Sequence, residues 1–233
     1  MKNIIVLTGA GISAESGIKT FRDSDGLWEN HDVMDVASID GWLRNPELVL
    51  NFYNQRRRQL KEVAPNAAHK ALVDLEQNYT VHIITQNVDD LHERAGSSKI
   101  IHLHGELRKV RSTANAKLVH HTEEDIHLGD LCQLGSQLRP HIVWFGEEVP
   151  LLGEAARLTS MADVVLIIGT SMQVYPAASL VGYAPAGASI FYIDPRPAIS
   201  YELERAKNLQ VIAAPASIGV PQLVDQLLSR ESA

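Results

Sequence analysis

Short apolar runs rich in β-branched residues recur along the chain, at 4–7, 81–85, 100–104, 141–145, 164–168, 189–193 and 210–213. Several are apolar at consecutive positions, which is typical of strands buried on both faces of a sheet. Amphipathic stretches at helical spacing separate some of them, including "PNAAHKALVDLEQ" and "PASIGVPQLVDQLLSR". This alternation predicts an α/β fold with a Rossmann-like, doubly wound parallel sheet that helices cover on both sides.

Two segments break this alternation. Residues 30–75 have helical patterning without a strand, and residues 106–139 are polar and weakly patterned. We interpret both as insertions that form one smaller module beside the sheet. The predicted organisation is a single domain over 1–233, with a large part at 1–29, 76–105 and 140–233, and a small module at 30–75 and 106–139.

Composition narrows the class of protein. A chain of 233 residues with a formal net charge of -7 lacks the basic footprint of a nucleic-acid-binding protein. The single cysteine, Cys132, excludes an intramolecular disulfide and fits a reducing compartment. No apolar stretch approaches the roughly 20 residues that span a bilayer, and the apolar run in "MKNIIVLTGAG" is too short for a signal peptide. We expect a cytoplasmic protein that binds neither nucleic acid nor membranes.

A glycine-rich loop follows the first predicted strand. In "IIVLTGAGISAESGI" the strand leads into residues 9–14, which fit the pattern G-x-G-x-x-[GA]. Such a turn brings backbone amides at a helix N-terminus close to a pyrophosphate, although a glycine-rich turn can also bind nothing. A dehydrogenase would place an acidic residue on a second strand about 20 positions later. Here "TFRDSDGLWENHD" reads as a loop, so we predict dinucleotide binding without ordinary oxidoreductase chemistry.

Polar residues gather where the predicted strands end. Asn87 and Asp89 follow the run at 81–85, where they could simply cap the next helix. His102 and His104 share one side of the run at 100–104. A histidine at such a place is either a structural hydrogen-bond partner or a general base that works near neutral pH.

Two further strand ends carry polar groups. Residues 169–171, Gly-Thr-Ser, end the run at 164–168, and Asp194 ends the run at 189–193. Asp194 suits ribose hydroxyls, although an aspartate before a proline also forms turns. Because ligands collect at the carboxyl ends of parallel strands, we expect these groups to share one site.

The stretch "NFYNQRRRQL" places three arginines in a row in an acidic chain. A solvated helix face is the ordinary interpretation of such a run. With Asn45 as the predicted N-cap, a step of 100° per residue puts Arg56 inside the apolar stripe beside Tyr53, Arg57 at its margin and Arg58 opposite. An inward arginine requires an anion, which is either a structural carboxylate or part of a ligand.

Five motifs together resemble one family. These are "GAGISAESGIKTFRDSDGLW", "TQNVDDLHERAG", "HLHGEL", "RPHIVWFGE" and "GTSMQVYPAASL". In order and spacing, from residue 5 to about 220, they are similar to the sirtuins, the NAD-dependent protein-lysine deacylases. The resemblance implies NAD as the cofactor, bound across the sheet edge, and acylated lysine side chains of proteins as partners.

The resemblance also implies residue roles. His104 matches the catalytic histidine, and Asp194 stands where the family usually has a ribose-binding asparagine. Val143, Phe145 and Gly146 lie in "IVWFGE", which resembles the segment that pairs with the substrate backbone as an added strand. The residues assigned to the cofactor are Gly9, Ala10, Gly11, Ile12, Ser13, Gly17, Ile18, Phe21, Arg22, Trp28, Gln86, Asn87, Asp89, Gly169, Thr170, Ser171, Asp194 and Ala216.

Tyr53-x-x-Arg56 matches the Tyr-x-x-Arg of class III sirtuins, which bind acyl groups that end in a carboxylate. A phenol and a guanidinium can bind a succinyl or malonyl carboxylate through charge-assisted hydrogen bonds. The implied activity is desuccinylation or demalonylation, with some deacetylation. The acyl oxygen attacks the ribose carbon as nicotinamide leaves, and His104 then acts as general base on a ribose hydroxyl, giving free lysine and O-acyl-ADP-ribose.

The chain departs from the family where most sirtuins hold a structural zinc with four cysteines. Ser112 stands at the position of the first cysteine, and Cys132 alone remains. A structural zinc site needs four ligands, which Cys132 with His120, His121 and His127 could supply in number, but their spacing matches no common zinc pattern. We therefore expect no metal and interpret the three histidines as surface residues. Two other functions stay open: protein ADP-ribosyl transfer, which uses the same cofactor, and a non-catalytic NAD-binding sensor, which the lost cysteines suggest.

Overall fold

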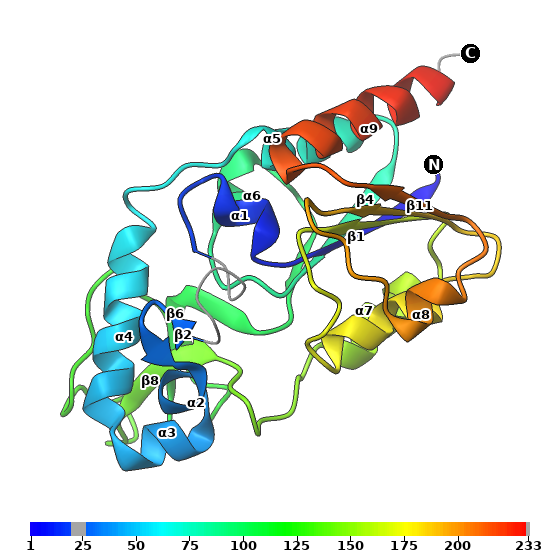
Figure 1. Ribbon diagram of the computed structural model, residues 1–233. Coiled ribbons are helices and arrows are strands. Elements are labelled where there is room, and N and C mark those ends of the chain that lie inside the picture. Colours follow the sequence, from blue (N-terminus) through cyan, green and yellow to red (C-terminus); the bar gives the residue numbers. More distant parts are fainter. Residues whose placement is uncertain (20–26, 232–233) are drawn as a thin grey trace.

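The computed structural model describes residues 1–19 and 27–231. At its centre is a six-stranded sheet in the order β11-β10-β9-β1-β4-β5 (Figure 1). All neighbouring strands in it are parallel, which confirms the predicted Rossmann-like α/β class. The strands are β1 (Asn3–Thr8), β4 (Thr80–Thr85), β5 (Ile100–His102), β9 (Val164–Ile168), β10 (Ser189–Ile193) and β11 (Leu209–Ile212).

Helices cover both faces of this sheet (Figure 1). Ile4 and Val6 pack on one face with α5 and α9, whereas Ile5 and Leu7 pack on the other with α7, α8 and η2. This explains why β1 is apolar at four consecutive positions, 4–7. The helices are α5 (Ala67–Leu75), α9 (Ala216–Glu231), α7 (Leu152–Thr159), α8 (Tyr201–Glu204) and the 3₁₀ helix η2 (Ala177–Tyr183). None of the helices within the described ranges is long and apolar enough to cross a membrane.

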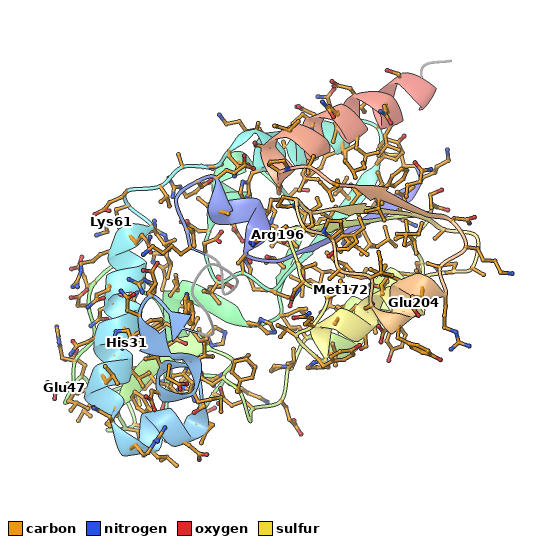
Figure 2. All side chains as sticks on the ribbon, viewed as in Figure 1. His31, Glu47, Lys61, Met172, Arg196 and Glu204 are labelled. Carbon is orange, nitrogen blue, oxygen red and sulfur yellow. The ribbon has the colours of Figure 1, made fainter. Side chains whose placement is uncertain are left out.

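A second group of elements lies to one side of the sheet (Figure 1). It comprises α2 (Val33–Val36), α3 (Ile39–Arg44), α4 (Pro46–Gln59), β2 (Leu27–Trp28), β3 (His31–Asp32), β6 (Gly105–Ser112), β7 (Val119–His121) and β8 (Leu138–Ile142). Strand β6 pairs antiparallel with β7 and β8. His31, labelled in Figure 2, joins the β2–β3 hairpin to α4 through an edge contact with Phe52 at 5.6 Å. Two short helices beside the main sheet, α1 (Gly11–Ala14) and α6 (Leu91–Ala95), complete the chain.

The structure differs from the predicted organisation in three elements. Helix α5, expected in the small module, buries Ala68 and Leu72 in the same core as β1. The polar segment 106–139, which is weakly patterned in sequence, contributes β6, β7 and the start of β8 to a three-stranded antiparallel sheet that extends to Ile142. The run at 141–145 does not join the parallel sheet, because β8 pairs with β6. Packing of α5 on the main sheet and backbone pairing of β6 with β7 and β8 decided these placements, and local patterning reports neither.

Helix α4 differs from the prediction at its arginines. It begins as predicted, since Asn45 Oδ1 accepts a hydrogen bond from the amide of Leu48 at 3.0 Å. Arg57, expected at the margin of the apolar stripe, is fully buried. Its Nε donates to the Leu107 carbonyl at 2.8 Å and its Nη1 to the Glu124 carbonyl at 3.0 Å.

Two apolar clusters on different sides of α4 explain this burial. Val49 and Phe52 belong to one cluster, and Leu50 belongs to another together with Val110 and Ile126. The second cluster lies against the antiparallel sheet, so α4 has a second inward stripe on which Arg57 falls seven residues after Leu50. Sequence patterning showed only the first stripe.

We expect the substitution Arg57→Met to lower the free energy of unfolding by about 2 kcal/mol, because it leaves buried carbonyl groups without their charged donor. Urea denaturation monitored by circular dichroism would measure the change. Arg58→Met is the matched control: Arg58 is exposed and pairs with Asp125 at the surface, so its loss should cost less than about 1 kcal/mol. Equal midpoints for the two variants would contradict the assignment.

Candidate active site

A cleft of about 540 Å³ opens at the carboxyl ends of the parallel strands and extends to α4 and the segment after β8. Glu15 and Arg196 line it at the α1 side; Arg196 is labelled in Figure 2. Most residues assigned from the sequence also line it: Gly9, Ala10, Gly11, Ile18, Trp28, Tyr53, Arg56, Gln86, Asn87, Asp89, His104, Val143, Phe145, Gly146, Gly169, Thr170, Ser171, Asp194 and Ala216.

A few assigned residues lie elsewhere. Ile12 is fully buried in the core beneath the glycine loop, and Ser13 is buried behind the cleft wall. Gly17 does not line the cleft, and its φ of +101° ends the turn after α1. Phe21 and Arg22 lie outside the described residues. Ile12 therefore supports the loop by packing, and any contact of Ser13 with a ligand would be indirect.

The glycines of the first loop are required by close packing against the end of β9. A Cβ added to Gly11 would lie 2.6 Å from the Gly169 Cα, and one added to Gly9 would lie 2.8 Å from the Gly169 carbonyl oxygen. Gly11 donates its backbone N–H to the Gly169 carbonyl at 2.8 Å. The backbones that follow β1 and β9 therefore lie in contact without side chains between them. We call this surface of Gly9, Gly11 and Gly169 the glycine floor; it leaves room for a phosphate-bearing ligand.

A buried polar network forms one wall. Asn87 Nδ2 donates to Ser13 Oγ at 3.1 Å, and Ser13 Oγ donates to Asp89 Oδ2 at 2.9 Å. Asp89 Oδ1 also accepts the amide of Leu91, the first residue of α6, at 3.1 Å, although the N-cap of this helix is Asp90. Burial raises the pKa of Asp89, and its hydrogen bonds with Leu91 and Ser13 oppose the shift. The network fixes the Asn87 amide at the edge of the cleft.

His104 is held in its neutral form at the cleft. Its Nδ1 lies 3.0 Å from the Gln86 carbonyl oxygen, which can only accept, so Nδ1 carries the proton and Nε2 keeps its lone pair. Burial lowers the pKa of His104, and the bond to Gln86 opposes this only in part. The ring lines the cleft and is neutral at physiological pH, as a general base must be.

His102 has the other role that the sequence left open. Its Nδ1 lies 3.1 Å from the Asn87 carbonyl and its Nε2 lies 2.6 Å from Glu93 Oε1, and both partners accept. Burial opposes the charged ring, but the contacts with Glu93 raise the pKa of His102 above its ordinary value. His102 is absent from the cleft lining and acts as a structural hydrogen-bond donor.

Tyr53 and Arg56 lie together at the α4 end of the cleft. Tyr53 is fully buried, and its hydroxyl accepts a hydrogen bond from Trp144 Nε1 at 3.0 Å. Arg56 Nε and Nη1 are buried without hydrogen-bond partners among the described residues, and its guanidinium lies 5.0 Å from the Phe52 ring centroid. Burial lowers the pKa of Arg56, and the charge of Glu29 opposes the shift.

The structural-carboxylate alternative for Arg56 would require an ion pair. Glu29 is the carboxylate whose charge acts on Arg56, yet it pairs with Lys19 at 3.3 Å. No ion pair of Arg56 occurs within residues 1–19 and 27–231. A guanidinium with buried, unpaired N–H groups at a cleft is suited to an anionic ligand.

The segment after β8 has part of its backbone already paired. Phe145 donates its N–H to the Ala37 carbonyl at 2.8 Å and accepts from the Ile39 amide at 3.4 Å. A substrate backbone would therefore pair with other groups, such as those of Gly146, which has a φ of +91° and open space beside it. The Phe145 side chain is exposed at the rim.

Asp194 forms the turn considered for it, and its place at the cleft leaves the predicted contact with ribose as a prediction. It lines the cleft, and its Oδ1 accepts the amide of Arg196 at 2.8 Å, which forms the turn after β10. The sequence did not single out Trp144, which also lines the cleft. Alternation along the run at 141–145 places Val143 and Phe145 on one side and Trp144 on the other, so only packing against α4 reveals its position.

Hydrogen bonds hold the segment where zinc ligands were expected in the family. Ser112 Oγ accepts the amide of Ala114 at 3.1 Å, and Cys132 Sγ lies 3.1 Å from the same oxygen. Cys132 Sγ in turn accepts the amide of Leu134 at 3.4 Å. In the described part of the chain, no group of three or more His, Cys, Asp and Glu side chains could hold a metal ion.

Comparisons with known proteins agree with this geometry. The model of the Sir2 family matches residues 9–176. The chain is 60% identical over 232 residues to the NAD-dependent protein deacylase of Helicobacter pylori (strain ATCC 700392 / 26695), with 100% of both chains covered. It is 51% identical over 234 residues to the protein of the same name from Bacteroides thetaiotaomicron, covering 98% of this chain and 99% of that one.

Solved structures show the same likeness. A Sir2 homologue in complex with NAD is 39% identical, with a TM-score of 0.86 over 98% of this chain and 90% of that one. Sir2Af2 bound to a myristoylated histone peptide is 29% identical, with a TM-score of 0.72 over 99% of this chain and 93% of that one. The glycine floor and the polar wall formed by Asn87, Ser13 and Asp89 fit NAD, the group bound in the first of these two structures.

Proposed function

The chain belongs to the Sir2 family and is an NAD-dependent protein deacylase, and from this premise we propose that it prefers succinyl- and malonyl-lysine, with some deacetylase activity. The proposed products are nicotinamide, free lysine and O-acyl-ADP-ribose. The observation that carries the acyl preference is the Arg56 guanidinium, which lies at the cleft beside Tyr53 with two buried N–H groups unpaired among the described residues.

The charge argument separates acidic from neutral acyl groups. Two buried N–H groups of a guanidinium without an anion are costly, and a carboxylate at the end of the acyl chain would satisfy them. An acetyl group offers no such charge. Tyr53 is fully buried and burial raises the pKa of its phenol, so it stays neutral and can donate a hydrogen bond to the carboxylate.

NAD bound in the cleft would supply the ribose carbon that takes the acyl oxygen as nicotinamide leaves, and one water molecule would be consumed when the lysine amine is released. The residues of the chain hold and orient the reactants around that carbon. Asn87, Ser13 and Asp89 keep a fixed polar wall, and Gln86 positions His104 through its carbonyl oxygen. His104 Nε2 then accepts a proton from a ribose hydroxyl, which makes that oxygen a better nucleophile.

The pH dependence of kcat/KM for deacylation should follow the protonation of the His104 ring. Because burial lowers its pKa below the ordinary value of 6.5 and the neutral ring is the active form, kcat/KM should stay level near neutral pH. It should fall only as the pH drops below the depressed pKa, where the ring becomes protonated. Nicotinamide release measured across the acid range would test this. An acid limb with its midpoint above 6.5 would contradict a buried neutral base.

The acyl preference can be tested with peptides of one sequence that carry acetyl-, succinyl- or malonyl-lysine. Peptide mass and nicotinamide release would be followed together with NAD. Faster removal of the acidic groups supports the proposal, and equal or faster removal of acetyl contradicts it. Transfer of ADP-ribose to protein without loss of acyl groups would favour the transferase alternative, and NAD binding without nicotinamide release would favour the sensor.

We further propose that the antiparallel sheet is held without zinc. Ser112 and Cys132 form hydrogen bonds to each other and to local amides, which supports this view. Dialysis against EDTA is therefore expected to leave kcat/KM and the thermal midpoint unchanged within about 10%, because no metal contributes to folding. Zinc in stoichiometric amount by mass spectrometry of the native protein, or loss of activity on dialysis, would contradict it.

A further inference from the structure

We propose that Trp144 is a positioning residue for acyl selectivity: its indole N–H fixes the Tyr53 hydroxyl so that the phenol proton faces the acyl end of the cleft. This inference rests on the proposed preference for acidic acyl groups. It adds a residue that does not itself bind the acyl carboxylate and that acts through Tyr53.

The geometry of the pair supports this role. Trp144 Nε1 donates to the Tyr53 hydroxyl at 3.0 Å, and the two ring centroids lie 6.2 Å apart. Trp144 is 2% exposed and Tyr53 is fully buried, yet both line the cleft. Once the phenol oxygen accepts the indole proton, its own proton must point elsewhere. No protein acceptor for that proton occurs among the described residues, so the cleft is left as its direction.

The bond also changes the phenol as a donor. A hydroxyl that accepts a hydrogen bond becomes a stronger donor through its own proton, because such bonds polarise one another. Burial is the main influence on the Tyr53 pKa and raises it, whereas the Trp144 bond and the charge of Arg139 lower it. Tyr53 therefore stays neutral, and Trp144 makes the neutral hydroxyl a better partner for a carboxylate.

Arg139 and Glu147 hold the indole of Trp144 in place. The Arg139 guanidinium stacks on the Trp144 ring, 3.3 Å from the ring centroid. Arg139 binds Glu147 through Nη1 at 2.8 Å and Nη2 at 3.0 Å, and Glu147 Oε2 accepts the backbone N–H of Trp144 at 2.8 Å. Arg111 also pairs with Glu147 at 2.8 Å.

This arrangement has two consequences. Backbone and ring of Trp144 are both held, so the direction of its N–H is fixed. Two arginines, Arg111 and Arg139, share the single carboxylate of Glu147, which leaves this group with a net positive charge beside Trp144. That charge favours an anionic acyl tail, in the same sense as Arg56.

The test compares matched acetyl- and succinyl-lysine peptides in the full-length protein. Trp144→Phe, Tyr53→Phe, the double variant and Arg56→Met are assayed with the wild type. Trp144→Phe should lower kcat/KM for the succinyl peptide about fivefold, the loss of one neutral hydrogen bond, mainly through KM, and change the acetyl value less than twofold. In the Tyr53→Phe background the same change should have no further effect. Trp42→Phe is the control, since Trp42 stacks on Trp144 at 5.5 Å and leaves the Tyr53 bond intact.

A change of shape can be separated from loss of the N–H by placing 3-benzothienylalanine at position 144, which keeps the ring size and lacks the donor. It should reproduce the selective fivefold loss even if Trp144→Phe does not fold. Equal losses for both peptides, or a full extra loss in the Tyr53→Phe background, would overturn the inference alone, provided that Arg56→Met still removes the succinyl preference. A wild type without succinyl preference would overturn the proposed function and this inference with it.

Discussion

Replacing His104 with asparagine is expected to lower kcat/KM for deacylation by about 10²- to 10⁴-fold, the range that a positioned general base contributes. The asparagine amide can still donate to the Gln86 carbonyl that now binds His104 Nδ1. It cannot accept a proton at the position of Nε2. The substitution therefore removes the base and retains its anchor.

The measurement is nicotinamide release with an acylated peptide, together with NAD affinity by calorimetry. NAD should bind within about threefold of wild type, because the glycine floor and the Asn87–Ser13–Asp89 network are untouched. His127→Asn is the matched control, since that histidine is exposed in the loop between β7 and β8. A His104→Asn variant with more than a tenth of wild-type activity would exclude His104 as the general base.

The substitution Arg56→Met is expected to lower kcat/KM for succinyl- and malonyl-lysine peptides by about 30- to 150-fold. This corresponds to about 2–3 kcal/mol, the contribution of hydrogen bonds to a charged group. The acetyl peptide should change less than about threefold, since its acyl group has no charge to lose a partner. Methionine keeps much of the side-chain volume that now packs over Phe52.

Two neighbouring arginines make this experiment specific. Arg58→Met removes a charge from the same helix at an exposed position and should leave both substrates unaffected. Arg57→Met should lower stability with little change in the ratio of succinyl to acetyl activity, because Arg57 binds backbone carbonyls outside the acyl pocket. If Arg56→Met lowers kcat/KM equally for the succinyl and acetyl peptides, the guanidinium is structural, and the preference for acidic acyl groups must be abandoned.

The sequence located most of the parallel sheet. Apolar runs such as 4–7 and 164–168 can only be buried from both sides, and this property is local. The sequence also predicted the cap at Asn45, the glycine loop and the polar strand ends. Each of these depends on only one turn or one helix terminus, so a short stretch of sequence is enough to predict it. The topology of a parallel sheet then brings those strand ends to one edge without further information.

The sequence alone did not locate groups whose position depends on a second surface. Arg57 and Trp144 each lie next to a residue that patterning singled out, and each faces a different direction from the one that patterning favours. Arg57 is buried because the antiparallel sheet covers a second side of α4. Trp144 reaches Tyr53 because the segment after β8 packs against the same helix.

For this protein, then, the sequence by itself determined the sheet class, the cofactor loop, the family and the candidate base, since these depend on short stretches and their order. Only the tertiary structure decided which arginine is structural, which one is left unpaired at the cleft, and which partner fixes Tyr53. The physical reason is that burial and hydrogen-bond satisfaction are properties of two packed surfaces, and the pattern along one helix or strand reports only one of them.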